Sequence, residues 1–236
     1  MNIVIIGVSG GIGSALTELI SSDARNTVFA LGRTAGDLRN GSIKSIEIDF
    51  KSEPSLQDAA QSIIRFGGAD AVISTVGLLH SAAVFPEKTL RTLDAEVLAE
   101  YFFVNSICTG LALKHFVPVL KKESWAVFAS LSARVGSISD NRLGGWYGYR
   151  ASKAAQNMLI KTASIEVART HKHASIVGLH PGTVDTSLSE PFTKNRRNLS
   201  LFTPEYSALK LWNLIQRLKP EDTGHVFAYD GCKVPC

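Results

Sequence analysis

The chain has 236 residues, of which 45% are hydrophobic and 19% charged, and this composition excludes both a disordered chain and a membrane-embedded protein. No stretch approaches the roughly 18 apolar residues of a membrane span, and the opening apolar run is too short for a signal peptide. We therefore expect a cytoplasmic protein with no membrane partner. The net charge of +4 is mild, and no basic stripe with interleaved aromatic residues indicates a nucleic-acid partner.

The chain begins with a buried-strand pattern that runs into a glycine-rich turn. Residues 2–6 form an apolar run, Gly7, Gly11 and Gly13 follow it, and a helical pattern opens at Ser14. A strand that turns through glycines into a helix presents backbone N–H groups and the positive helix end to an anion. We predict that this loop binds the pyrophosphate of a dinucleotide. Its Gly-x-x-x-Gly-x-Gly spacing differs from the standard G-x-G-x-x-G fingerprint.

Beyond this loop, strand-like runs alternate with helical patterns. This alternation predicts an α/β fold, a single domain over residues 1–236 with a Rossmann-type, doubly wound parallel sheet and helices on both faces. The predicted strands are Ile3–Ile6, Thr27–Leu31, Ile43–Ile48, Ala71–Thr75, Ala126–Ser130, Ser175–Leu179 and Val226–Tyr229. The predicted helices are Gly11–Ser22, Ser55–Phe66, Asp94–Leu120, Tyr149–Thr170 and Pro204–Leu218. Ligands of such sheets lie beyond the carboxyl ends of the strands, where every motif described below falls.

An arginine follows the second predicted strand, where dinucleotide sites distinguish their cofactors. NAD sites place an acidic residue there, whereas NADP sites place an arginine near the 2′-phosphate. This chain has Gly32 where the acid is expected and Arg33 next to it, and a guanidinium binds phosphate through charge-assisted hydrogen bonds. We therefore expect NADP(H) rather than NAD(H). The alternative is that Arg33 is a solvated loop residue.

Three tyrosines are followed four residues later by a lysine, and one of these pairs has a catalytic context. Tyr149 opens a long helical pattern directly after a glycine-rich loop, so Tyr149 and Lys153 share one helix face. A nearby ammonium favours the phenolate and brings a tyrosine toward a useful acid–base range. The other two pairs lack this context. Tyr229/Lys233 lies in a turn, and Tyr206/Lys210 has no upstream hydroxyl.

The three cysteines and six histidines favour no metal site. Cys108, Cys232 and Cys236 form no C-x-x-C pair and no disulfide framework, and we expect Cys232 and Cys236 to be exposed thiols. The histidines offer only the pair His171 and His173, which we place in a surface turn.

The glycine loop, the Tyr149-x-x-x-Lys153 pair and the segment His180-Pro-Gly-Thr-Val-Asp-Thr186 together resemble the short-chain dehydrogenase/reductase family over nearly the whole chain. The segments Ser-Ala-Arg-Val-Gly and Tyr-Arg-Ala-Ser-Lys are most similar to the C-factor and sniffer-type carbonyl reductases. The resemblance implies an NAD(P)-dependent oxidoreductase that interconverts a small-molecule carbonyl and an alcohol, as a homodimer or homotetramer. The alternative is a dinucleotide-binding regulatory protein of C-factor type with little turnover.

The resemblance assigns catalytic roles to four residues. Tyr149 is the general acid/base, and Lys153 lowers its pKa and holds the nicotinamide ribose. Ser132 binds the substrate oxygen, with Ser130 as a rival because the spacing to the next glycine departs from the family. Asn105 opens a helix around a water that relays protons to the lysine, or is an ordinary buried asparagine bonded to backbone.

The resemblance also implies the contacts of the cofactor. Asp49 meets the adenine, and the backbone near Val184 pairs with the carboxamide beside Thr186. The turn Ser74-Thr75-Val76-Gly77 departs from the family's Asn-Asn-Ala-Gly, which leaves its side-chain contribution open. The full set of expected cofactor-binding residues is Gly7, Ser9, Gly11, Ile12, Gly13, Arg33, Asp49, Phe50, Gly77, Tyr149, Lys153, Pro181, Gly182, Val184 and Thr186.

Two segments, Arg134–Gly148 and Ser187–Phe202, are expected to wall the substrate. Their aromatic residues favour an apolar substrate portion, whereas a basic trio is suited to an anionic one. Both segments are also compatible with solvated loops. The aromatic residues are Trp146, Tyr147 and Phe192, and the basic trio is Lys194, Arg196 and Arg197.

Overall fold

The computed structural model describes residues 1–34, 41–193 and 201–235, with the side chain of Thr193 excepted. Within these residues, seven parallel strands form one sheet in the order β3-β2-β1-β4-β5-β6-β7. The strands are β1 Asn2–Ile6, β2 Thr27–Gly32, β3 Ile43–Glu47, β4 Ala71–Ser74, β5 Ala126–Leu131, β6 Ala174–His180 and β7 Val226–Ala228. The helices are α1 Gly11–Ser21, α2 Glu53–Arg65, α3 Ala95–Phe102, α4 Cys108–Phe116, α5 Tyr147–Val167, α6 Glu190–Thr193 and α7 Pro204–Ile215.

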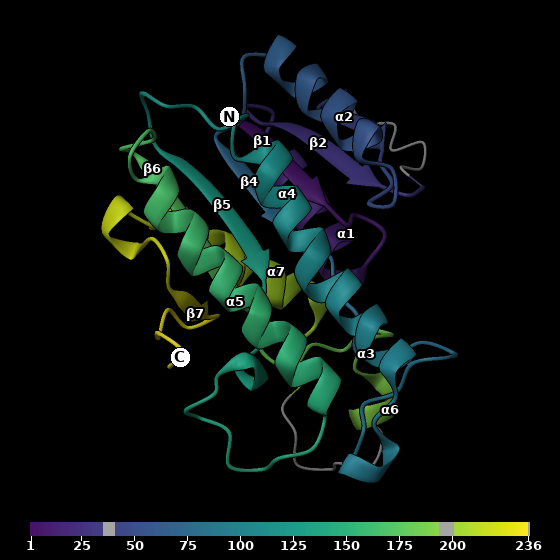
Figure 1. Cartoon of the computed structure of the whole chain (residues 1–236). Helices are drawn as coiled ribbons and strands as arrows, with labels where there is room; N and C mark the ends of the chain where they lie inside the picture. The colour runs from purple at the N-terminus through teal and green to yellow at the C-terminus, as the bar shows by residue number, and fades with distance from the viewer. Residues whose placement is uncertain (35–40, 194–200, 236) are drawn as a thin grey trace.

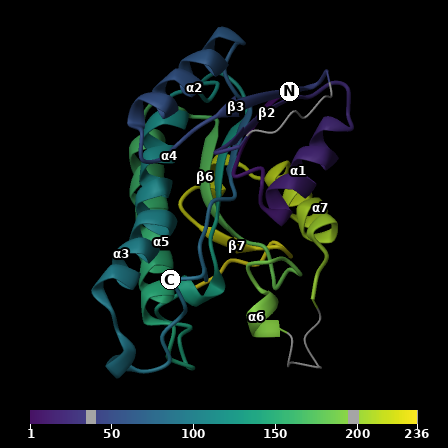
Figure 2. The same ribbon diagram turned by 90° about the vertical axis from the view of Figure 1, so that its right-hand side faces the viewer.

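The helices cover the sheet on both faces. Helices α2, α4 and α5 lie on one face (Figure 1), and the edge-on view shows α1 and α7 on the other (Figure 2). Parallel neighbours require crossover connections. Helix α1 lies in the crossover from β1 to β2, α2 in that from β3 to β4, and α5 in that from β5 to β6, while α3 and α4 share the crossover from β4 to β5 and α6 and α7 share that from β6 to β7. The predicted doubly wound sheet is therefore confirmed.

Alternate residues of the same strands enter two separate cores, because successive side chains point to opposite faces of a strand. Val4 and Phe128 join the core beneath α2, α4 and α5. Ile5 and Val127 join the core beneath α1 and α7. Since both faces are buried, the strands read as continuous apolar runs rather than alternating ones.

The helix predicted over 94–120 is interrupted. Asp94 caps α3 by accepting hydrogen bonds from the backbone N–H groups of Glu96 and Val97 at 2.9 and 3.0 Å. A π-helical turn, Phe103–Ile107, then joins α3 to α4. A π turn inserts an extra residue into the helix, as is frequent at functional sites, and here it contains Asn105.

The helical run Ala95–Phe116 is long and apolar enough to cross a membrane, by length and composition alone. It spans 22 residues and contains an 18-residue window with a mean hydropathy of 1.2, so the expectation that no stretch approaches that length is wrong. The run packs on α5, α2 and β4, and Tyr101 and Phe116 are fully buried. A helix that contributes to a protein core needs the same apolar composition, and we attribute its hydropathy to this packing.

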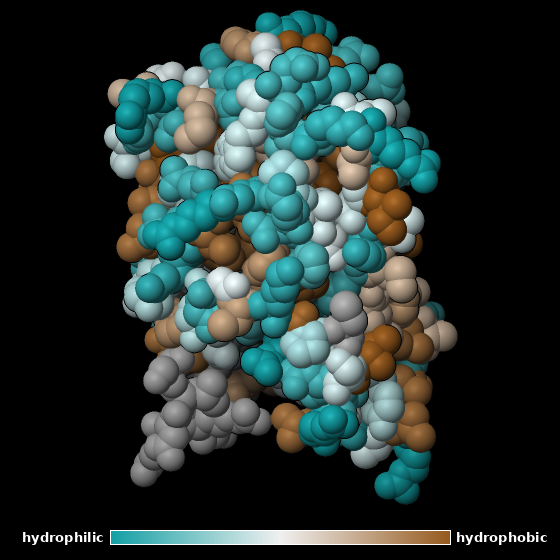
Figure 3. Space-filling view, turned by 90° about the vertical axis from the view of Figure 1, so that its left-hand side faces the viewer, coloured by the Kyte–Doolittle hydropathy of each residue, from teal (hydrophilic) through white to brown (hydrophobic). Residues whose placement is uncertain are grey.

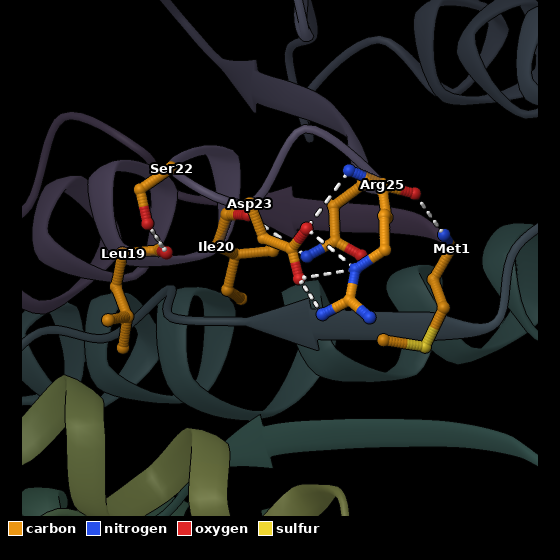
Figure 4. Close-up of polar contacts among 7 residues, drawn as sticks. Met1, Leu19, Ile20, Ser22, Asp23 and Arg25 are labelled. Atoms are coloured by element: carbon orange, nitrogen blue, oxygen red, sulfur yellow. Dashed lines mark hydrogen bonds and ion pairs between the residues drawn. The ribbon is translucent and has the colours of Figure 1, made fainter.

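The amino-terminal edge of the sheet, opposite the motifs, is closed by local contacts (Figure 4). The Met1 amino group donates to the Arg25 carbonyl at 2.7 Å, and the Arg25 guanidinium pairs with Asp23 at 2.7 Å. The Arg25 side chain is largely exposed, so the ion pair contributes little to stability. A hollow of about 400 Å³ lies at this edge, remote from the loops that carry the motifs.

Candidate active site

The turn after β1 is built so tightly that only glycine fits. Gly7 has a φ of 94°, in the left-handed region that side chains disfavour. A Cβ on Gly13 would lie 2.3 Å from the Gly7 carbonyl oxygen, and one on Gly11 would lie 2.8 Å from the Thr186 methyl group. The start of α1 therefore lies directly against the end of β1, with its first N–H groups at the strand's carboxyl end, where an anion binds.

Thr75, one of the residues that depart from the family's motif, braces this turn. Its Oγ1 lies 2.9 Å from the Ile6 carbonyl oxygen and 3.0 Å from that of Gly7, and the hydroxyl donates to one of them at a time. A Cβ on Gly7 would lie 2.7 Å from the same hydroxyl. We missed this brace in the sequence, where the only signal was a threonine in place of the family's asparagine.

A cavity of about 440 Å³ lies between the loops that follow β1, β2, β3 and β4. It brings together residues from five separate segments of the chain, of which the fifth runs from α3 through the π turn to the start of α4. Arg33 is exposed at its edge, and the Asp49 carboxylate accepts a hydrogen bond from the Lys51 backbone N–H at 2.9 Å. The expected cofactor-binding residues that line it are Gly7, Ser9, Arg33, Asp49, Phe50 and Gly77.

A second cavity, of about 570 Å³, lies at the ends of β5 and β6. The loops that follow the strands form the lower part of the molecule in Figure 1, and Figure 3 shows hydrophobic residues among hydrophilic ones over that part of one face. Tyr149 and Ser132 line this cavity together with several expected cofactor-binding residues, which are Ile12, Pro181, Gly182, Val184 and Thr186.

The two cavities flank the glycine loop, which fits a nicotinamide dinucleotide. Gly7 and Ser9 line the first cavity, and Ile12, at the start of α1, lines the second. A dinucleotide consists of two nucleotides joined by a pyrophosphate, and the loop with its helix N-terminus lies where the joint would be. A Cβ on Gly11 would collide with Thr186 and one on Gly13 with the Gly7 carbonyl, so the glycines allow the start of the helix to lie close to the turn.

The structure separates the two candidate serines. Ser132 lines the second cavity, and its Oγ donates to the Asn157 Oδ1 on α5 at 2.6 Å. Ser130 is fully buried, does not line the cavity, and accepts a hydrogen bond from the Gln156 Nε2 at 2.8 Å. Only Ser132 therefore shares the cavity with Tyr149.

Tyr149 and Lys153 are both buried, one turn apart on α5. Their exposed fractions are 7% and 3%, and the Lys153 Nζ lies 6.0 Å from the centre of the Tyr149 ring. Burial disfavours the charged form of each group, so it raises the pKa of the Tyr149 phenol and lowers the pKa of the Lys153 ammonium to about 7. The lysine is therefore close to titration at neutral pH.

The Asn105 side chain ties α5 to the loop after β4. Its Oδ1 accepts from the Leu78 N–H at 2.8 Å, and its Nδ2 donates to the Leu78 carbonyl and the Ser152 Oγ, both at 3.0 Å. The two contacts with Leu78 are to backbone, as expected for an ordinary buried asparagine, whereas Asn105 itself lies within the π turn. Asn105 thus holds the opened helix against the two elements beside Lys153.

Glu87 is a functional residue that sequence reasoning missed. It is 5% exposed, and its Oε2 accepts from the Gly148 N–H in the first turn of α5 at 3.1 Å. Its backbone carbonyl accepts from the Trp146 N–H at 2.5 Å. Trp146 has a left-handed φ of 54° and no capping side chain of its own, so Glu87 caps the helix that carries Tyr149.

Aromatic side chains form one wall of the second cavity. Trp146 and Phe192 pack edge to face with ring centres 5.2 Å apart, and Phe85 lies 6.2 Å from Phe192. The His80 ring packs against Phe192 with ring centres 5.7 Å apart, and its Nε2 lies 2.8 Å from the Ser187 carbonyl oxygen. Tyr147 does not line the cavity. The residues Lys194, Arg196, Arg197 and Cys236 lie outside the described part of the chain.

Comparison with known proteins identifies the family. Residues 1–197 match the short chain dehydrogenase family. An uncharacterised oxidoreductase of Schizosaccharomyces pombe is 30% identical over 98% of this chain and 96% of its own length. The C-signal protein of Myxococcus xanthus is 31% identical over 62% of this chain and 82% of its own length.

A solved structure has the same fold. The carbonyl reductase Sniffer of Drosophila melanogaster superposes with a TM-score of 0.85 and 20% identity, covering 100% of this chain and 99% of that one. The predicted resemblance to proteins of the sniffer and C-factor type is confirmed. The chain belongs to the short-chain dehydrogenase/reductase family and is an oxidoreductase of the nicotinamide dinucleotide-dependent kind.

Proposed function

We propose that this protein is an NADP(H)-dependent carbonyl reductase in which Tyr149 is the general acid. One observation carries the proposal. Tyr149 and Ser132 line one cavity beside the glycine loop, and Lys153 is buried one turn behind Tyr149 on the same helix. These are a hydroxyl, an acid and a cation placed around one space, which is what reduction of a carbonyl needs.

Each side chain has a distinct task. A bound nicotinamide cofactor would supply the hydride for the carbonyl carbon. The Ser132 hydroxyl, which donates to the Asn157 Oδ1 in the free protein, rotates to donate its hydrogen bond to the carbonyl oxygen instead. Tyr149 transfers its proton to that oxygen as negative charge develops, which gives the alcohol. Lys153, when protonated, stabilises the resulting phenolate and so lowers the pKa of Tyr149 from the high value that burial alone imposes.

The preference for NADP(H) rests on Arg33. It lines the first cavity with no acidic residue at the preceding position, Gly32, and a carboxylate there would repel a 2′-phosphate. The aromatic wall of the second cavity supports a substrate with an apolar portion next to its carbonyl group.

We further propose one domain over residues 1–236, a cytoplasmic location, and a homodimer or homotetramer. Exposed apolar side chains on α5 and the π turn support self-association, because such residues rarely gather on the surface of a monomer. They are Ile107, Met158 and Ile165, with exposed fractions of 49%, 65% and 55%.

The test follows NADPH absorbance against a panel of ketones, aldehydes and quinones with the wild type and Tyr149→Phe. We expect turnover that falls by at least about a hundredfold in Tyr149→Phe, with NADPH binding retained. Tyr206→Phe, on the outer side of α7, is the matched control and keeps full activity. NADPH binding without turnover of any compound would instead favour the dinucleotide-binding regulatory protein.

A further inference from the structure

Gln156 lies one turn after Lys153 on α5 and is fully buried. Its Oε1 accepts a hydrogen bond from the Lys153 Nζ at 2.9 Å. The Nζ also donates to the Leu131 carbonyl at 3.0 Å. A buried amide is costly unless its polar atoms are paired, so a glutamine that only filled space here would be a poor choice over an apolar residue.

The other end of the amide fixes its orientation. The Gln156 Nε2 lies within hydrogen-bond distance of three acceptors, which are the Ser130 Oγ at 2.8 Å and the Leu131 carbonyl and Thr109 Oγ1 at 3.1 Å. If the amide were flipped, its NH₂ group would face the Lys153 ammonium, and two donors would oppose each other. The surrounding acceptors therefore aim Oε1 at Nζ.

This contact continues to the π turn. The Thr109 Oγ1 donates to the Asn105 carbonyl at 3.0 Å. A continuous chain of hydrogen bonds thus runs from Lys153 through Gln156 and Thr109 to the backbone of Asn105. It links α5, α4 and the π turn through groups that are all buried.

The third proton of the ammonium remains for the cofactor side. A Cβ built on Gly77, which lines the first cavity, would lie 3.5 Å from the Lys153 Nζ. With two of its three N–H groups engaged on the interior side, the ammonium presents the remaining one toward this loop. The two interior acceptors determine this direction.

We propose that Gln156 is a positioning residue that holds Lys153 in place and stabilises its charged form, so that the ammonium remains available to Tyr149. The consequence for catalysis rests on the proposed function, whereas the effect on Lys153 itself does not. An acceptor bonded to an ammonium favours the protonated state and opposes the effect of burial.

The groups that face Lys153 leave Gln156 as the side chain that can exert this influence. Tyr149, on the same helix, is neutral in the free protein because burial raises its pKa. Strand β5 contributes the Leu131 carbonyl, and the loop after β4 contributes Gly77, neither of which titrates.

The test titrates Lys153 directly in the cofactor-free protein by NMR of the lysine Cε and Nζ nuclei in lysine-labelled samples. The signal missing from Lys153→Met identifies the residue. We expect its midpoint to rise by about one unit or more in Gln156→Glu, where a carboxylate replaces the amide oxygen, and to fall in Gln156→Met. Gln61→Glu, on the exposed side of α2, is the matched control and leaves the midpoint unchanged.

An unchanged Lys153 midpoint in both Gln156 variants would overturn the proposal. Thermal unfolding checks that each variant is folded. Should Gln156→Met fail to fold, Thr109→Val replaces it, because this change removes one of the three acceptors that orient the amide, and we then expect a smaller downward shift. If the Lys153 midpoint shifts neither in Gln156→Glu nor in Thr109→Val, the assignment is equally refuted. Because these measurements need no turnover, a protein that reduces no carbonyl compound but shows the shifts would refute only the proposed function.

Discussion

The Glu87 carboxylate and the Gly148 backbone N–H are joined by a 3.1 Å hydrogen bond, although 61 positions separate them in the chain. The bond lies one residue before Tyr149. A Cβ on Gly148 would lie 2.9 Å from the Glu87 Oε1 and 2.6 Å from the Tyr101 ring, so the helix start, the carboxylate and the ring fit together only with glycine. Glu87 therefore fixes where α5 begins and, through it, where Tyr149 lies.

Glu87→Ala removes both the cap and the negative charge at the start of α5. We expect the free energy of unfolding to fall by about 1–2 kcal/mol, and kcat to fall because Tyr149 loses its fixed position. Glu87→Gln keeps an acceptor oxygen and should lose less of both. Urea unfolding and steady-state kinetics measure the effects, with Glu166→Ala on the exposed side of α5 as the control. Equal behaviour of Glu87→Ala and Glu166→Ala would contradict the capping role.

Ser132→Ala and Ser130→Ala should affect different properties. Because Ser132 lines the cavity, we expect kcat to fall by about 10²–10³-fold in Ser132→Ala, with little change in NADPH binding. Ser130→Ala removes an acceptor of the buried Gln156 amide and should mainly lower the melting temperature. Kinetics and thermal unfolding of both variants provide the comparison. A larger loss of kcat in Ser130→Ala would reverse the assignment of the two serines.

Arg33→Ala should weaken the binding of NADPH and spare that of NADH. Loss of a charge-assisted contact to the 2′-phosphate corresponds to a Kd increase of about 10–100-fold for NADPH alone. Titration of the fluorescence of each reduced cofactor measures both constants. Arg65→Ala, at the exposed end of α2, serves as the control. A similar loss for both cofactors would mean that Arg33 does not recognise the 2′-phosphate.

Burial of Lys153 should make stability depend on pH in a definite direction. Its pKa is about 7 in the folded protein against an ordinary value of 10.5 for lysine, so between these values the unfolded chain binds a proton that the native protein does not. The free energy of unfolding therefore rises with pH across this window, by at most about 5 kcal/mol at about 1.4 kcal/mol per unit. Urea unfolding of the wild type and Lys153→Met at several pH values isolates the contribution. A constant difference between the two proteins would contradict it.

The sequence by itself determined the features that depend on neighbours in the chain. Apolar runs between turn residues located the buried strands, because a strand buried on both faces needs such a run. The strand β3, with the mixed sequence Ile-Lys-Ser-Ile-Glu, lies at the edge of the sheet and is only partly buried. The pair Tyr149 and Lys153 was found because a spacing of four residues places two side chains on one helix face whatever surrounds the helix. The glycines of the first turn were found for a similar reason, since the strand, turn and helix that they join are consecutive.

Only the tertiary structure decided which distant groups meet. Glu87 reaches Gly148 from the loop after β4. Thr75, at the end of β4, reaches the carbonyls of Ile6 and Gly7 at the end of the neighbouring strand β1. Gln156 links three elements around Lys153. The choice between Ser130 and Ser132 depends on which one faces the cavity, and they are separated by two residues at the end of a strand. Such contacts depend on strand order, register and helix packing, which bring together residues whose separation along the chain carries no signal of its own.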